Sequence, residues 1–135
     1  MSPRALFFAA ALALAVGCEK LDAATDPVWG KEPCGHCAML VGDRRFAAEV
    51  VTDTERRFFD DIGCMVLWTE SHPGKVVKAW VRDAQGTAWL DARAARYARA
   101  ARTPMDFGFE GRAPGASETV GFEEMKASVL QRSAR

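Results

Sequence analysis

The chain has 135 residues, with 18 Lys or Arg side chains against 18 Asp or Glu side chains, so its formal net charge at pH 7 is zero. This balance, without any cluster of basic and aromatic residues, argues against a nucleic-acid partner. The length suits one compact domain or two very small ones.

The N-terminus has the plan of a secretory signal. A positive charge at Arg4 is followed by an uninterrupted apolar run from Ala5 to Val16. Such a run fits the apolar core of a signal peptide, and it falls short of the roughly 20 apolar residues that a membrane span needs. Residues 1–17 are therefore expected to be a signal peptide.

Cys18 is the expected anchor of the exported protein. The preceding small residues, Ala15-Val-Gly17, resemble a lipobox, in which the cysteine receives lipid and becomes the new N-terminus. Glu19 follows in place of the Asp of an inner-membrane retention signal, which favours the outer membrane, with residues 18–28 as a lipid-anchored linker in the periplasm. The alternative is an ordinary thiol in a soluble secreted protein.

An odd number of cysteines then remains in the exported chain, namely Cys34, Cys37 and Cys64. Disulfides consume thiols in pairs, so at least one of the three must be free, shared between chains or bound to a ligand. This is the first indication of a site.

The remaining sequence predicts an α+β fold built from antiparallel strands and two helices. Breakers at residues 33–37 indicate a tight turn. One helix is expected from Asp60 or Asp61 to about Ser71, and a second over residues 121–131. Short strands are expected at residues 38–41, 46–52, 56–59, 76–82, 87–90 and 97–100, and a loop at 103–114.

This order of elements, strand-strand-helix followed by strand-strand-strand-helix, suggests two similar small halves with one helix each; the family resemblance described below implies that they are ββαβ-like units. The first would span residues 29–73 and carry the Cys-x-x-Cys-x-Met motif. The second, residues 74–135, would be rich in strands and end in the C-terminal helix.

Several metal-binding side chains are concentrated in short segments. Two thiols, an imidazole and a thioether fall within residues 34–39, a third thiol lies near the start of the first helix, and a methionine sits in the late Gly/Pro-rich loop. The candidate ligands are Cys34, His36, Cys37, Met39, Cys64 and Met105.

The softness of these donors favours one metal ion. Thiolates and thioethers together prefer copper(I), which accepts two or three ligands. Zinc prefers four Cys or His ligands, and one helical turn after Cys64 stands Trp68, so zinc lacks a fourth ligand unless His36 serves.

Each ligand also has a structural alternative. Cys34 and Cys37 could form a disulfide, and Cys64 could be a small buried hydrophobic residue, since free cysteine packs like one. His36, flanked by turn residues, could equally be an exposed bystander.

The motifs together resemble those of NosL, the copper lipoprotein accessory of nitrous oxide reductase. They are Cys-x-x-Cys-x-Met at residues 34–39, Phe-x-Asp at 59–61, Trp-x-Asp-Ala at 89–92 and Pro-Met at 104–105. The resemblance covers about Trp29 to Phe109. The spacing of the three cysteines is also similar to that of small treble-clef metal domains, with Trp68 in place of the last cysteine.

This resemblance implies two strand-strand-helix-strand units, copper(I) bound by Cys, Met and His, and delivery of copper to a periplasmic enzyme, nitrous oxide reductase, after receipt from a donor. The matching positions are Cys37 and Met39 first, then Met105. Two positions depart from the family pattern: Ala38 replaces the glycine of Cys-Gly-Met, and Asp106 replaces the glycine of Pro-Met-Gly.

We therefore expect a copper(I) metallochaperone and not an enzyme. One alternative is a thiol-disulfide oxidoreductase using Cys34 and Cys37, in which His36 would lower the pKa of the attacking thiol. A second is a structural zinc module that displays a protein-binding surface.

Overall fold

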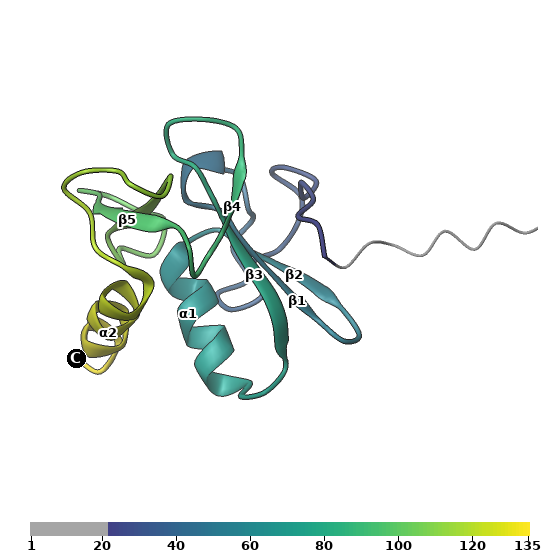
Figure 1. The fold of residues 1–135 in the computed structure, drawn as a ribbon. Coiled ribbons are helices and arrows are strands. Elements are labelled where there is room, and N and C mark those ends of the chain that lie inside the picture. The colour runs from purple at the N-terminus through teal and green to yellow at the C-terminus, as the bar shows by residue number, and fades with distance from the viewer. Residues whose placement is uncertain (1–21) are drawn as a thin grey trace, which may run out of the picture.

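The computed structural model describes residues 22–135, so the expected signal peptide and Cys18 lie outside the described residues (Figure 1). In chain order, the described elements are η1 (Arg44–Phe46), β1 (Ala48–Thr52), β2 (Arg56–Phe59), α1 (Ile62–Ser71), β3 (Val76–Arg82), β4 (Trp89–Asp91), β5 (Arg96–Arg99), β6 (Phe109–Arg112) and α2 (Phe122–Ser133).

Four strands form an antiparallel sheet in the order β2-β1-β3-β4. The central strand β1 is buried along its whole length, as expected for a strand rich in valine that is covered on both faces. Two further strands, β5 and β6, form a separate antiparallel pair. The predicted α+β class with antiparallel strands and two helices is confirmed.

The boundaries of α1 follow from its capping. The Asp61 carboxylate accepts a hydrogen bond from the backbone N–H of Gly63 at 2.8 Å, which satisfies a free donor of the first turn. Of the two aspartates that the sequence offered, Asp61 is therefore the cap. The helix ends at Ser71, where His72 stacks on the ring of Trp68.

The late loop differs from its expectation. Residues 103–114 were predicted to be irregular because they are dense in Gly and Pro, yet Phe109–Arg112 forms β6. The strand pairs with β5, and Phe109 and Glu110 are buried. Long-range pairing has overridden a weak local preference for strand here.

The four-stranded sheet lies in the middle of three layers. Helix α1 packs on one face, while the segment from Ala23 to Trp29 crosses the opposite face (Figure 1). That segment is held by side chains of the sheet: Glu49 accepts from the Thr25 N–H, and Arg56 donates to the Ala23 carbonyl.

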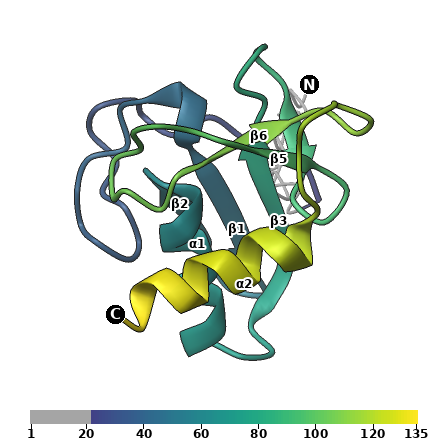
Figure 2. The same ribbon diagram turned by 90° about the vertical axis from the view of Figure 1, so that its left-hand side faces the viewer.

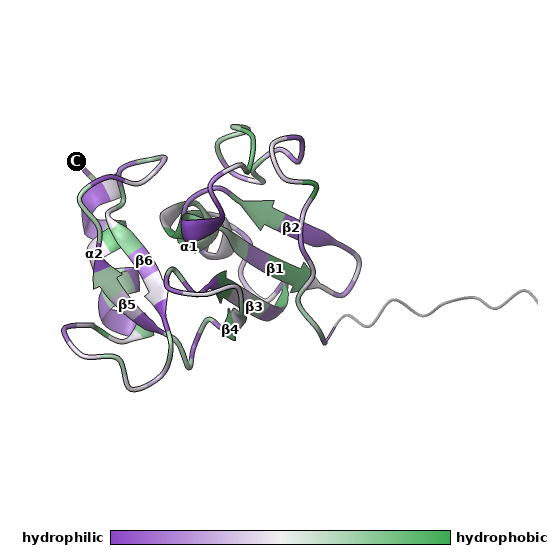
Figure 3. Ribbon diagram, turned by 90° about the horizontal axis from the view of Figure 1, so that it is seen from above, coloured by the Kyte–Doolittle hydropathy of each residue, from purple (hydrophilic) through white to green (hydrophobic). Residues whose placement is uncertain are grey.

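The second sheet and α2 complete the molecule beyond α1. Helix α2 lies against α1 (Figure 2). Figure 3 shows that α2, β5 and β6 form one group beside the group made by the larger sheet and α1. Met125 and Val129 of α2 are buried and belong to the same hydrophobic core cluster as residues of α1 and the larger sheet. The two groups share one hydrophobic core.

Polar contacts also join the two groups. The buried Glu110 of β6 accepts hydrogen bonds from Arg45, at 2.6 Å, and from Arg112. Asp83 forms a single parallel bridge with Gly111. Since β3 pairs with β1, the sequence division between residues 73 and 74 does not coincide with the division between the two sheets.

Within residues 22–135, neither helix has the length and apolar character that crossing a membrane requires.

Candidate metal centre

Cys34 and Cys37 lie on a compact hairpin-like loop between residues 30 and 41. The loop is closed by hydrogen bonds from the Cys34 N–H to the Met39 carbonyl, at 2.7 Å, and from the Ala38 N–H to the Cys34 carbonyl, at 3.1 Å. Pro33 and Leu40 bridge its base. The two thiols are therefore held on one tight turn.

Ala38 has an uncommon backbone conformation. Its φ of 64° lies in the left-handed region, which glycine enters freely and alanine enters at a cost. The residue after Met105 shares this property, since Asp106 has a φ of 62°. Both positions at which the sequence departs from the Cys-Gly-Met and Pro-Met-Gly patterns thus keep a conformation that suits glycine.

The loop is placed against the end of β2. The Gly35 N–H donates to the Phe58 carbonyl at 2.8 Å, and the Gly35 backbone lies so close to the Phe59 ring that an added Cβ would come within 3.2 Å of it. This contact brings the Cys34 and Cys37 thiols beside Asp60, which follows β2, and beside the first turn of α1, which carries Cys64.

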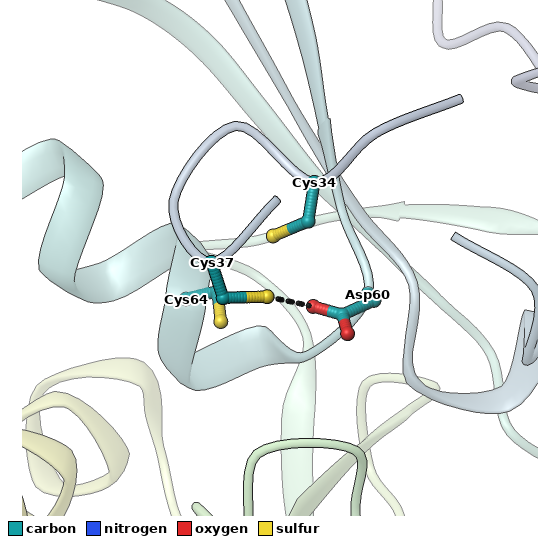
Figure 4. A group of neighbouring side chains, drawn as sticks. All are labelled: Cys34, Cys37, Asp60 and Cys64. Carbon is teal, nitrogen blue, oxygen red and sulfur yellow. Dashed lines mark hydrogen bonds between the residues drawn. The ribbon is translucent and has the colours of Figure 1, made fainter. Parts of the chain in front are cut away.

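Three thiols and one carboxylate converge at this point. The ligand atoms of Cys34, Cys37, Asp60 and Cys64 all lie within 4.8 Å of one another (Figure 4). The Cys37 thiol donates a hydrogen bond to Oδ1 of Asp60 at 3.3 Å. Cys34 and Cys64 are 4% and 0% exposed, whereas Cys37 is only partly buried and forms the accessible side of the cluster.

The cluster distributes charge unevenly. Hydrogen bonding to Cys64 lowers the pKa of Cys34 to about 4, which favours the thiolate form of this residue. Burial raises the pKa of Cys37 to about 11, and hydrogen bonding to Cys34 together with burial raises the pKa of Cys64. Burial and the neighbouring Cys34 raise the pKa of Asp60 to about 6.

A cation fits this arrangement. At neutral pH the Cys34 thiolate and the Asp60 carboxylate place negative charge side by side in a largely buried site, and a bound cation would offset their repulsion. Oδ2 of Asp60 is buried without a hydrogen-bond partner, as expected of an atom reserved for a ligand. The donor set of three sulfurs and one oxygen can hold copper(I) or zinc.

The remaining candidate ligands are solvent-exposed and are not among the clustered ligand atoms. His36 is exposed, and Met39 is 48% exposed on the same loop as Cys37. Met105 is 38% exposed on a loop whose backbone is bound to Asp61, the residue next to Asp60. The three thiols are thus brought into one cluster, while the two thioethers and the imidazole are solvent-accessible.

Asp60 is the residue that sequence reasoning missed. The sequence pattern indicates Asp60 only as a possible helix cap, and it leaves zinc without a fourth ligand unless His36 serves. Its neighbour Asp61 takes the capping role, which leaves the Asp60 carboxylate free to face the thiols. Two consecutive aspartates before a helix that carries a cysteine were the available signal, because one carboxylate suffices for the cap.

Cys34, Cys37 and Cys64, the cysteines among residues 22–135, are free in the structure, so the alternative of a disulfide between Cys34 and Cys37 is not what the structure has. A low thiol pKa would suit a redox enzyme, but the Cys34 thiol that has it is buried and lies on a loop. An attacking thiol needs access to its target disulfide, so the geometry does not favour thiol-disulfide exchange.

The fold and the cluster together define a small α+β protein with a sulfur-rich candidate metal site. No protein-family model matches the chain, and a search of curated proteins found no match. Among solved structures, the chain is similar to the crystal structure of the copper chaperone NosL from Shewanella denitrificans, with a TM-score of 0.54. The match covers 80% of this chain and 87% of that chain at 15% sequence identity. The likeness to NosL that the motifs indicated is thereby confirmed for the fold.

Proposed function

We propose that this protein is a copper(I) metallochaperone that carries its ion on the thiol cluster and passes it to a periplasmic copper enzyme. The observation that carries this proposal is the convergence of Cys34, Cys37 and Cys64 with Asp60 within 4.8 Å. The same fold in a protein described as a copper chaperone supports it independently.

Copper(I) suits the surroundings of the cluster as well as the cluster itself. Soft thiolate and thioether donors select copper(I) over zinc, which gains little from a thioether. Met39 and Met105 are exposed, although methionine ordinarily prefers a protein core. Exposed thioethers could bind copper(I) as it leaves the thiols during transfer to another protein.

Transfer would proceed by ligand exchange. The buried Cys34 and Cys64 thiols form the inner side of the site, and the partly exposed Cys37, together with Met39, forms the outer side. A soft ligand of the acceptor can approach from the outer side and bind copper before the last ligand of this protein leaves. No free ion is then released during transfer.

The destination is proposed from the sequence and the fold together. Export by the signal peptide and a lipid on Cys18 would place the protein in the periplasm, at the outer membrane. Nitrous oxide reductase is the acceptor that the NosL resemblance suggests, and a separate protein would supply the copper. Confinement to a membrane surface would raise the frequency of encounters without changing intrinsic affinity.

The proposal is tested by titrating the reduced domain, residues 22–135, with copper(I) against a competing chelator. We expect one tightly bound ion, a loss of affinity in Cys37→Ser and Cys64→Ser, and no change in Met125→Leu, whose side chain is buried in the core and is not one of the clustered ligands. Unchanged affinity in Cys37→Ser would contradict the proposed site.

A structural zinc module is the second candidate, and one observation favours it. Asp60 supplies the fourth ligand that a tetrahedral zinc site needs beside three cysteines. Such a module would be purified with one zinc per chain and would unfold when the zinc is chelated. Elemental analysis together with thermal denaturation after chelation separates this candidate from the copper chaperone.

A further inference from the structure

The loop that carries Met105 is attached to the helix that carries Cys64 by a single buried carboxylate. Asp61 is 0% exposed, and its two oxygens accept three hydrogen bonds from two segments far apart in sequence. Oδ1 accepts from the Gly63 N–H at 2.8 Å, while Oδ2 accepts from the Thr103 hydroxyl at 2.6 Å and from the Met105 N–H at 2.9 Å.

The loop itself is closed around Thr103. The Thr103 hydroxyl oxygen accepts from the Gly108 N–H at 3.2 Å, and the Thr103 carbonyl accepts from the Asp106 N–H at 3.0 Å. Asp61 therefore holds a preformed turn and does not have to order a flexible segment.

A packing contact seals the same junction. Phe107 lies so close to the Gly63 backbone that a Cβ at position 63 would fall 2.1 Å from the Phe107 ring. Only glycine fits there without displacing the loop. The hydrogen bonds and this contact together press the loop of residues 103–108 onto the first turn of α1, immediately before Cys64.

We propose that Asp61 is a positioning residue for copper binding: it fixes the Met105 backbone beside the thiol cluster, so that the Met105 thioether and the thiols can act on one ion. This inference rests on the proposed function. It assigns different roles to the two adjacent aspartates: Asp60 faces the metal site, and Asp61 joins the loop that carries Met105 to the first turn of α1, which carries Cys64. Residues that orient metal ligands without touching the metal commonly control affinity.

The test is a double-mutant cycle between Asp61 and Met105 in the reduced domain, read as copper(I) affinity. In Asp61→Asn, the side-chain oxygen can still cap α1, but the amide group cannot accept from the Met105 N–H. We expect Asp61→Asn to weaken copper(I) binding about tenfold, in the range found for outer-shell partners of metal ligands. In the Met105→Leu background, the same substitution should cause no further loss.

A second measurement does not involve copper. The Met105 amide should exchange its hydrogen faster in Asp61→Asn than in the wild type, while the Tyr97 amide, which donates to Val120, should be unaffected. Asp83→Asn is the matched control, since Asp83 also accepts from a backbone N–H two residues on but lies in a different turn.

Thr103→Val provides an independent variant that leaves the Asp61 cap intact. It removes the hydroxyl that donates to Asp61. We expect Thr103→Val to weaken copper(I) binding in the protein that has Met105 and to have no further effect in Met105→Leu. Should Asp61→Asn fold poorly, Thr103→Val carries the test.

The outcomes separate the inference from the function. If Cys37→Ser weakens copper(I) binding but Met105→Leu does not, the inference is overturned and the chaperone proposal stands. If Asp61→Asn weakens copper(I) binding equally in Met105→Leu, Asp61 acts through the whole fold and not through Met105. That result also overturns the inference. If the wild-type domain binds no copper(I), or Cys37→Ser has no effect, the proposed function itself fails.

Discussion

Replacing Ala38 with glycine should stabilise the apo protein. Ala38 occupies the left-handed region at a φ of 64°, which costs about 1–2 kcal/mol for a residue with a Cβ. Glycine avoids this cost but makes the unfolded chain more flexible, which offsets about 0.4–1 kcal/mol. The hydrogen bond from the N–H of residue 38 to the Cys34 carbonyl does not depend on the side chain and is kept. The expected net gain is about 0.5–1 kcal/mol.

Urea denaturation of the reduced apo domain measures this gain directly, and a rise in Tm of about 2–5 °C should accompany it. Ala127→Gly is the matched control, because Ala127 is exposed in the middle of α2, where glycine costs about 1 kcal/mol. Destabilisation of Ala38→Gly by an amount similar to Ala127→Gly would refute the argument that the turn after Cys37 is strained.

Three further predictions concern the site and its supports. Gly63→Ala should destabilise the fold by about 1–3 kcal/mol, because the new methyl group would overlap Phe107; wild-type stability in urea would contradict the packing described. Burial raises the pKa of Asp60 from 3.8 to about 6, so between these values the folded state holds a proton that the unfolded state has released. This contribution to stability therefore falls as pH rises through that window, and Asp60→Asn should gain stability relative to the wild type there; a difference that is independent of pH would contradict the shift. Met39→Leu should weaken copper(I) binding while leaving Tm unchanged, since the side chain is 48% exposed; a fall in Tm without loss of affinity would make Met39 structural.

Local patterns were sufficient for most of the fold. Strong signals bounded α1: an aspartate that caps it, apolar residues at spacings of three and four in its first two turns, and a Pro-Gly pair after its end. β6 was missed because Phe109–Arg112 contains a glycine and a glutamate, and its identity as a strand depends on pairing with β5. The buried position of Glu110 depends on Arg45, far away in the sequence, and no local pattern reveals such a partner.

The sequence identified the three cysteines as candidate ligands, but it did not reveal the roles of the two aspartates in the site. The turn-favouring residues at 33–37 indicated the tight turn that carries Cys34 and Cys37, and the odd number of cysteines indicated that at least one thiol is free, shared between chains or bound to a ligand. That Asp60 would face the thiols and Asp61 would hold the loop of Met105 follows from the path of the chain between β2 and α1. From the sequence alone the two adjacent carboxylates look equivalent. They are distinguished only when the first residue of α1 is known, because that decides which aspartate is the cap.

The segment that crosses the sheet opposite α1 bears on how the molecule would sit in the cell. Its first attachment is the Ala23 carbonyl, bound by Arg56, and Asp26 is held further along by Arg82 and Trp89. From Cys18 to Ala23 a fully stretched chain reaches only about 18 Å. With an acyl group on Cys18, the folded domain would stay within about this distance of the bilayer surface. The proposed acceptor would then have to approach the membrane surface to reach the thiol cluster.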